Sequence, residues 1–139
     1  MLFLLKKFLS IKTFFGKDVM RKRSNVTRYE GFSVFSGRPT ECFHHLLFGK
    51  GVRKLADDDL ITIPLLHCEH NMSMNGVQYQ IHDNPAAEKL SKIAGQLAYE
   101  RLYLARMLEQ CDNVGHQSYE DWLDEAREDF RRRYGESWL

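Results

Sequence analysis

Histidine is concentrated in one part of this chain. Five of the six histidines fall within a 39-residue window: His44, His45, His67, His70 and His82. Imidazole is the commonest transition-metal ligand near neutral pH, and a divalent ion needs three or more donors that converge on it. A lone histidine in an apolar run is more often a hydrogen-bonded core residue than a ligand. Five histidines at these spacings favour a metal site.

The adjacent histidine pair lies in a short apolar run, ECFHHLLF, at residues 41–48. Neighbouring side chains of a strand point to opposite faces, so one imidazole can face a site while the other faces elsewhere. A second β-like run, LITIPLL, follows at residues 60–66. The segment between the runs, GKGVRKLADDD, is interpreted as a loop because it holds two glycines and three aspartates.

Two helices are predicted after the histidine window. Asn84 can cap the first helix, and Pro85 suits its first turn. Leucines and one isoleucine at helical spacing predict an apolar stripe along about six turns: Ile93, Leu97, Leu104 and Leu108. The second helix is predicted to begin at Ser118, with Asp121 three positions on, and to end at Arg131–Arg133, where the helix dipole favours cations.

The formal net charge of +1 is unevenly distributed. Residues 1–25 carry +6, residues 26–85 carry −2 and residues 86–139 carry −3. The basic end is therefore the natural candidate to contact a polyanion. Its first fifteen residues also fit an amphipathic helix that packs on the domain or a partner, with membrane-surface binding as the alternative.

Length and composition exclude several classes of protein. At 139 residues, 43% hydrophobic and 28% charged, the chain fits one globular domain. The first apolar stretch is interrupted by Lys6 after five residues, far short of the ~20 residues that span a bilayer. Three cysteines without a C-x-x-C pair predict neither a disulfide framework nor a zinc ribbon, and they favour a cytoplasmic setting.

Three segments in this order resemble the HNH (ββα-metal) endonucleases: ECFHHLLFG, LITIPLLHCEHN and IHDNPAAEKLSKIAGQLAYE. The resemblance covers about residues 31–139, and it is greatest to the phage and prophage branch that includes the RecA-dependent recombination-enhancement nucleases. It implies an α+β fold with a ββα-metal core at 31–85, two supporting helices within 86–139 and a basic N-terminal arm at 1–30.

The resemblance also implies a role for each histidine. His45 matches the general base, which takes a proton from the attacking water. His44, His70 and His82 match the ligands of one divalent ion, Mg²⁺, Mn²⁺ or Zn²⁺, and His67 is the alternate ligand. The implied activity is metal-dependent hydrolysis of DNA phosphodiester bonds, with a RecA filament as a further partner. The oligomeric state is not predicted.

The chain departs from the family pattern in two places. No structural zinc knuckle is expected, because the four matching positions carry no cysteine: Ser33, Ser36, Leu66 and Glu69. The family's central asparagine, which fixes the base histidine, is also missing. Thr62 lies near its position, and one of Asp57–Asp59 is expected to supply the acceptor for His45 instead. These departures favour the rival hypothesis of a DNA-binding recombination-accessory protein that keeps the fold without cutting; a structural zinc-histidine domain is a third.

Two basic stretches are candidate DNA contacts. One lies in the N-terminal arm and the other in the segment between the two β-like runs. Their members are Arg21, Lys22 and Arg23, and Lys50, Arg53 and Lys54. For the second stretch, a solvated basic loop is an equal alternative.

Overall fold

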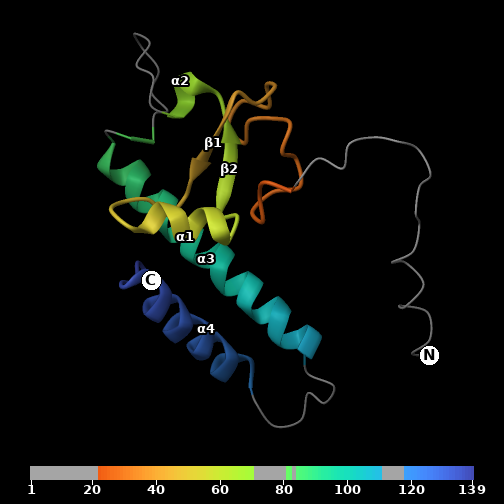
Figure 1. Cartoon of the computed structure of the whole chain (residues 1–139), viewed down its shortest axis with the longest axis vertical. Helices are drawn as coiled ribbons and strands as arrows, with labels where there is room; N and C mark the ends of the chain where they lie inside the picture. The colour runs from red at the N-terminus through yellow and green to blue at the C-terminus, as the bar shows by residue number, and fades with distance from the viewer. Residues whose placement is uncertain (1–21, 71–80, 83, 111–117) are drawn as a thin grey trace, which may run out of the picture.

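The computed structural model describes residues 22–70, 81–82, 84–110 and 118–139. These residues form a mixed α and β fold, in agreement with the α+β class expected. The elements are β1 (Cys42–His45), α1 (Val52–Asp58), β2 (Thr62–Leu65), α2 (His67–His70), α3 (Pro85–Gln110) and α4 (Tyr119–Tyr134). Figure 1 shows the small sheet beside the first part of the long α3, with α4 running alongside the rest of α3. None of the described helices is long and apolar enough to cross a membrane.

The two strands form an antiparallel pair, in which His44 lies opposite Ile63 and His45 opposite Thr62. The segment that connects them is not the expected loop, because residues 52–58 form α1. This helix forms because Val52, Leu55 and Ala56 share one face at i, i+3 and i+4 spacing, and that face packs on the core. Arg53 and Lys54 therefore lie on a helix.

The start of α3 is as predicted, but its buried face is not. Asn84 Oδ1 accepts a hydrogen bond from Ala87 N at 3.2 Å. The predicted leucine stripe is wrong, since Leu97 is 51% exposed and Leu108 56%. The buried residues of α3 are small or polar: Ser91, Gly95, Gln96, Ala98, Tyr99 and Glu100. This face is set by its partners, which are the backbone after β1 and the polar tail of the chain.

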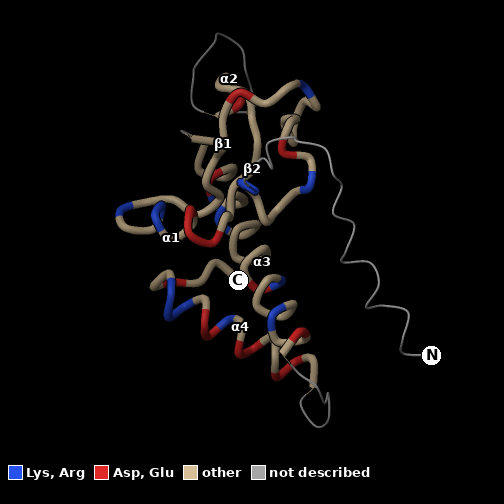
Figure 2. The backbone as a smooth tube through the Cα atoms, turned by 45° about the vertical axis from the view of Figure 1, so that its right-hand side comes forward, with Lys and Arg blue, Asp and Glu red and all other residues tan. Residues whose placement is uncertain are grey.

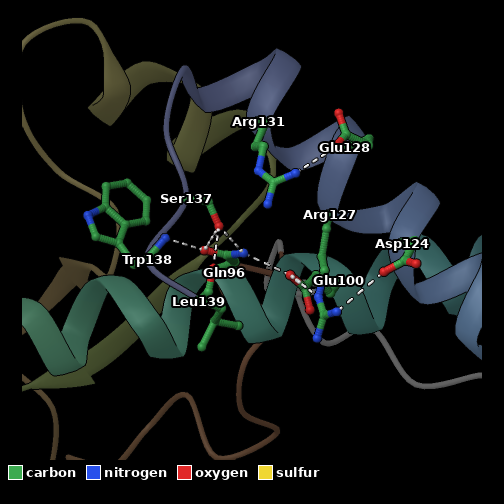
Figure 3. Close-up of polar contacts among 9 residues, drawn as sticks. All are labelled: Gln96, Glu100, Asp124, Arg127, Glu128, Arg131, Ser137, Trp138 and Leu139. Atoms are coloured by element: carbon green, nitrogen blue, oxygen red, sulfur yellow. Dashed lines mark hydrogen bonds and ion pairs between the residues drawn. The ribbon is translucent and has the colours of Figure 1, made fainter.

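The C-terminal tail is fastened to α3 through Gln96, which is fully buried. Its Oε1 accepts from Trp138 N at 2.8 Å, and its Nε2 donates to Ser137 Oγ at 3.0 Å and to Glu100 Oε1 at 2.9 Å. Arg127 of α4 lies 4.0 Å from the same Glu100 oxygen. Figure 3 shows these contacts joining α3, α4 and the tail. The network explains why polar residues occupy the buried face of α3.

Helix α4 has the capping box expected at Ser118 and Asp121. The first turn of this helix holds acidic residues and its last turn holds arginines (Figure 2). Arg131 and Arg132 pair with acids three positions earlier, at 2.5 and 3.0 Å. Trp122, Phe130 and Tyr134 of this helix are buried, and Trp138 is partly buried against the core that contains Phe130 and Tyr134.

Residues 23–30, which the sequence places in the basic arm, are bonded to β2 and the residues before it. Ser24 Oγ donates to Thr62 O at 2.6 Å, and Thr62 Oγ1 donates to Arg23 O at 2.7 Å. Asn25 N donates to Leu60 O at 2.8 Å. The folded part of the chain therefore begins before residue 30. Arg21 and the predicted amphipathic helix lie outside the described residues.

Candidate metal centre

Three of the predicted site histidines converge. His44, His70 and His82 each offer a ring nitrogen, and these nitrogens lie within 4.8 Å of one another. The three ring centroids are 5.0, 5.2 and 5.0 Å apart. His44 comes from β1, His70 from the end of α2, and His82 from the residues that lead into α3. Together with His45 and Arg53, they line a cavity of about 250 Å³.

The proton on His44 is placed by its neighbours. Ser91 Oγ donates to Leu46 O at 2.9 Å and lies 2.9 Å from His44 Nε2. A hydroxyl has one hydrogen, so Ser91 accepts the bond from His44 and the imidazole carries its proton on Nε2. The other nitrogen, Nδ1, is then a lone-pair donor. It is buried and has no hydrogen-bond partner among the described residues.

That unpartnered nitrogen is the structural sign that a metal ion fits this site. Buried polar atoms nearly always have a partner, and a coordinated ion would satisfy this one. Burial, followed by the nearby His70 and His82, lowers the pKa of His44 to about 3. His44 is therefore neutral near physiological pH, as a metal ligand must be.

The other two histidines of the cluster also have supporting partners. His70 Nδ1 lies 3.9 Å from Cys42 Sγ, and His82 Nδ1 lies 3.6 Å from Glu88 Oε1. Contacts of this kind orient metal-binding imidazoles and leave the far ring nitrogen for the ion. Burial, then the neighbouring His82, lowers the pKa of His70. Ser91, Cys42 and Glu88 were not identified from the sequence as supporting residues, although Glu88 and Ser91 lie three residues apart just after His82.

His67 does not join the cluster formed by the described residues. It is the first residue of α2 and is exposed, and its backbone N donates to Glu41 Oε2 at 2.9 Å. One turn of helix separates it from His70, and only His70 faces the cavity. Of the two alternatives, the structure brings His70 into the cluster.

His45 is bonded to an acid from α1. Its Nε2 lies 2.6 Å from Asp57 Oδ1, which confirms the expectation that one of Asp57–Asp59 supplies the acceptor. A carboxylate accepts the proton of Nε2–H, so the neutral imidazole keeps its lone pair on Nδ1. The His45 side chain is 13% exposed and that of Asp57 61%. His45 lines both the histidine cavity and a larger groove of about 680 Å³.

The four positions that match the family's zinc knuckle do not carry its ligands, but hydrogen bonds join all four of them. Ser33 Oγ donates to Glu69 Oε2 at 2.5 Å, which also accepts from Leu66 N at 2.9 Å. Ser36 N donates to Ser33 Oγ at 3.3 Å. Burial acts to raise the pKa of Glu69, but these hydrogen bonds outweigh it and the pKa is lowered. Hydrogen bonds therefore join the segment before β1 to the start of α2.

The basic residues predicted to contact DNA are divided by the structure. Arg53 lines both the histidine cavity and the larger groove. Of these two spaces, Lys22 and Arg23 line only the groove. Lys54 pairs with Asp58 along α1 at 3.1 Å. Lys50 is exposed and lines neither space.

Comparison with models of protein families, with curated proteins and with solved structures found no match to this chain.

Proposed function

We propose that this protein is a metal-dependent endonuclease with an HNH-like ββα-metal core, which hydrolyses DNA phosphodiester bonds. One observation carries the proposal: a cluster of three histidines and a fourth histidine bonded to a carboxylate line the same cavity. The antiparallel β1 and β2, followed by His82 shortly before α3, agree with the order of elements in such a core.

The histidines of the site have two roles, which are to hold an ion and to move a proton. His44, His70 and His82 would hold one divalent ion, Mg²⁺, Mn²⁺ or Zn²⁺. When bound, the ion supplies positive charge that stabilises the phosphate and the leaving oxygen in the transition state. His45 accepts the proton of the attacking water on Nδ1, while Asp57 holds Nε2–H and stabilises the imidazolium. Arg53 lies between the two spaces, where it can bind the phosphate.

A second function is favoured by the exposure of the carboxylate. Asp57 is 61% exposed, so water competes for the bond that orients His45. A protein whose base histidine is weakly oriented can bind metal and DNA as a recombination-accessory protein without cutting. Both functions leave a RecA filament as a proposed partner.

Plasmid nicking with Mg²⁺, Mn²⁺ or Zn²⁺, with and without a RecA filament on single-stranded DNA, separates the two functions. We expect His45→Ala to lower the cleavage rate by about 10²–10⁴-fold, because a general base acts in the transition state. The same variant should keep its metal affinity in calorimetry, whereas His82→Ala should lose it.

His67→Ala is the matched control, and it should retain both cleavage and metal affinity. Wild-type protein that binds metal and DNA but cleaves under none of these conditions would favour the accessory function. Equal loss of metal affinity in His45→Ala and His82→Ala would contradict the roles assigned to them.

A further inference from the structure

A groove of about 680 Å³ is lined by His45 but by none of the three clustered histidines. His45 and Phe43 are two residues apart on β1, so their side chains emerge on the same face of the strand. Both line this groove, and His45 and Arg53 also line the histidine cavity. A substrate held at the cavity would therefore continue into the groove.

The acidic residues of the groove are paired, whereas its cations have no ion pair within the described part of the chain. Asp57 is bonded to His45, and Asp58 is bonded to Lys54. Arg53, Lys22 and the guanidinium of Arg23 have neither an ion pair nor a hydrogen bond with any described residue. The groove thus presents positive charge that is free to meet an anionic ligand such as a phosphate chain.

The guanidinium group of Arg23 lies over the ring of Phe43. The guanidinium carbon lies 4.2 Å from the centre of the Phe43 ring, and Arg23 is exposed to solvent. The Arg23 backbone is fixed beside His45, because its carbonyl accepts from Thr62 Oγ1 at 2.7 Å and Thr62 pairs with His45 across the sheet. Guanidinium planes and aromatic rings are the surfaces on which unpaired bases stack.

We propose that this groove binds single-stranded DNA, with Arg23 and Phe43 stacking an unpaired base next to the phosphate held at His45. A base inside a duplex is stacked between its neighbours and cannot present its face to such a surface. Arg53 and Lys22 contact the flanking phosphates. The inference rests on the proposed function, because it takes the DNA phosphate at His45 as its starting point.

Fluorescence anisotropy in the presence of EDTA tests the groove without cleavage, using a single strand and a duplex of equal length. Wild-type protein should bind the single strand more tightly. Arg23→Lys keeps the charge and removes the plane, so it should weaken single-strand binding about tenfold, as expected for one lost stacking contact. Its effect on duplex binding should stay within about twofold, and the salt dependence should be unchanged because no phosphate contact is lost.

Phe43→Leu keeps an apolar strand residue and should have the same effect, with a thermal melt to show that it folds. Arg106→Lys, on the exposed side of α3, is the matched control and should change neither affinity. Equal affinity for single strand and duplex, or full single-strand affinity in Arg23→Lys, would overturn the proposal that the groove binds single-stranded DNA. If the protein shows the expected binding pattern but cleaves no DNA with any metal, the proposed nuclease activity is wrong and the proposal of single-strand binding in the groove is retained.

Discussion

Ser91 determines which nitrogen of His44 can bind a metal. Its hydroxyl is committed to the carbonyl of Leu46, so it can only accept from His44 Nε2. This relay of hydrogen bonds from His44 through Ser91 to Leu46 is buried, and water cannot replace either bond. A metal ligand with a fixed tautomer needs no proton rearrangement before it binds an ion. At His45, Asp57 likewise accepts the proton of Nε2, but here the carboxylate is exposed and water competes for the bond.

We expect Ser91→Ala to weaken metal binding by about 10–100-fold, the usual effect of losing the hydrogen bond behind a ligand. It should also lower the free energy of unfolding by about 1–3 kcal/mol, because His44 Nε2–H and Leu46 O lose a buried partner. Competition with a chelator measures the first effect and urea denaturation the second. Ser91→Thr keeps the hydroxyl and is the control. Unchanged metal affinity in Ser91→Ala would show that the relay does not set the tautomer.

At the scale of elements, α3 supports the site because it approaches the end of β1 closely. A Cβ atom built on Gly95 would lie 2.7 Å from both Cγ and Cδ2 of Leu47, which is fully buried. Gly95 and Ser91 lie on the same side of α3, one turn apart. Gly95 lets α3 lie close to the residues that follow β1, and this close approach also brings Ser91 within hydrogen-bonding distance of His44.

Gly95→Ala tests this packing. In an exposed helix the change would stabilise by about 1 kcal/mol, but here overpacking costs about 1–3 kcal/mol. We expect a net loss of stability of up to about 2 kcal/mol in urea denaturation, together with weaker metal binding.

The double variant Gly95→Ala/Leu47→Ala is the control, because removing the Leu47 side chain makes room for the new methyl group. In the Leu47→Ala background, Gly95→Ala should no longer destabilise. A stabilising effect of Gly95→Ala in the wild-type background would show that α3 does not lie this close.

At the scale of the whole molecule, Asp59 connects the C-terminal helix to the site. Arg133 donates to both of its carboxylate oxygens at 2.7 and 2.8 Å, and Tyr134 OH donates to one of them at 2.6 Å. Asp59 directly follows α1, two residues after Asp57. Helix α4 thus fixes the end of α1, and α1 in turn presents Asp57 to His45.

The two buried tyrosines at this junction predict a loss of stability in alkali. Burial, and then the bond to a carboxylate, raises the pKa of Tyr134 beside Asp59 and of Tyr99 beside Asp129. The folded chain keeps these protons while the unfolded chain releases them above a pH of about 10. The unfolded state then binds fewer protons, so stability is complete below that pH and falls as pH rises above it.

Each such tyrosine should lower the free energy of unfolding by up to about 1.4 kcal/mol per pH unit above its ordinary pKa. Urea denaturation at a series of alkaline pH values measures this slope. Tyr134→Phe should flatten it, and Tyr119→Phe, at a tyrosine that is 64% exposed, is the control. The same slope in Tyr134→Phe and wild type would contradict the assignment.

The sequence by itself determined the features that depend on neighbouring residues. The strand carrying His44 and His45 was readable because its pattern is local, as were the caps at Asn84 and Ser118. The sequence also indicates which histidines converge, namely His44, His82 and either His70 or His67. The strand and the caps are local signals, each within one strand or one helical turn, whereas the histidine set is implied by the order of three segments and their resemblance to a family.

Only the tertiary structure decided which residues support those histidines. The sequence predicts a loop where α1 lies, because the three apolar residues of this short helix are recognisable as a face only when the core that they pack against is known. The leucines of α3 marked the wrong face, because burial there follows partners such as Leu47 and the chain terminus. Ser91 meets His44 across 47 residues of sequence. No local pattern carries that contact, since it exists only after the chain has folded and brought the two elements together.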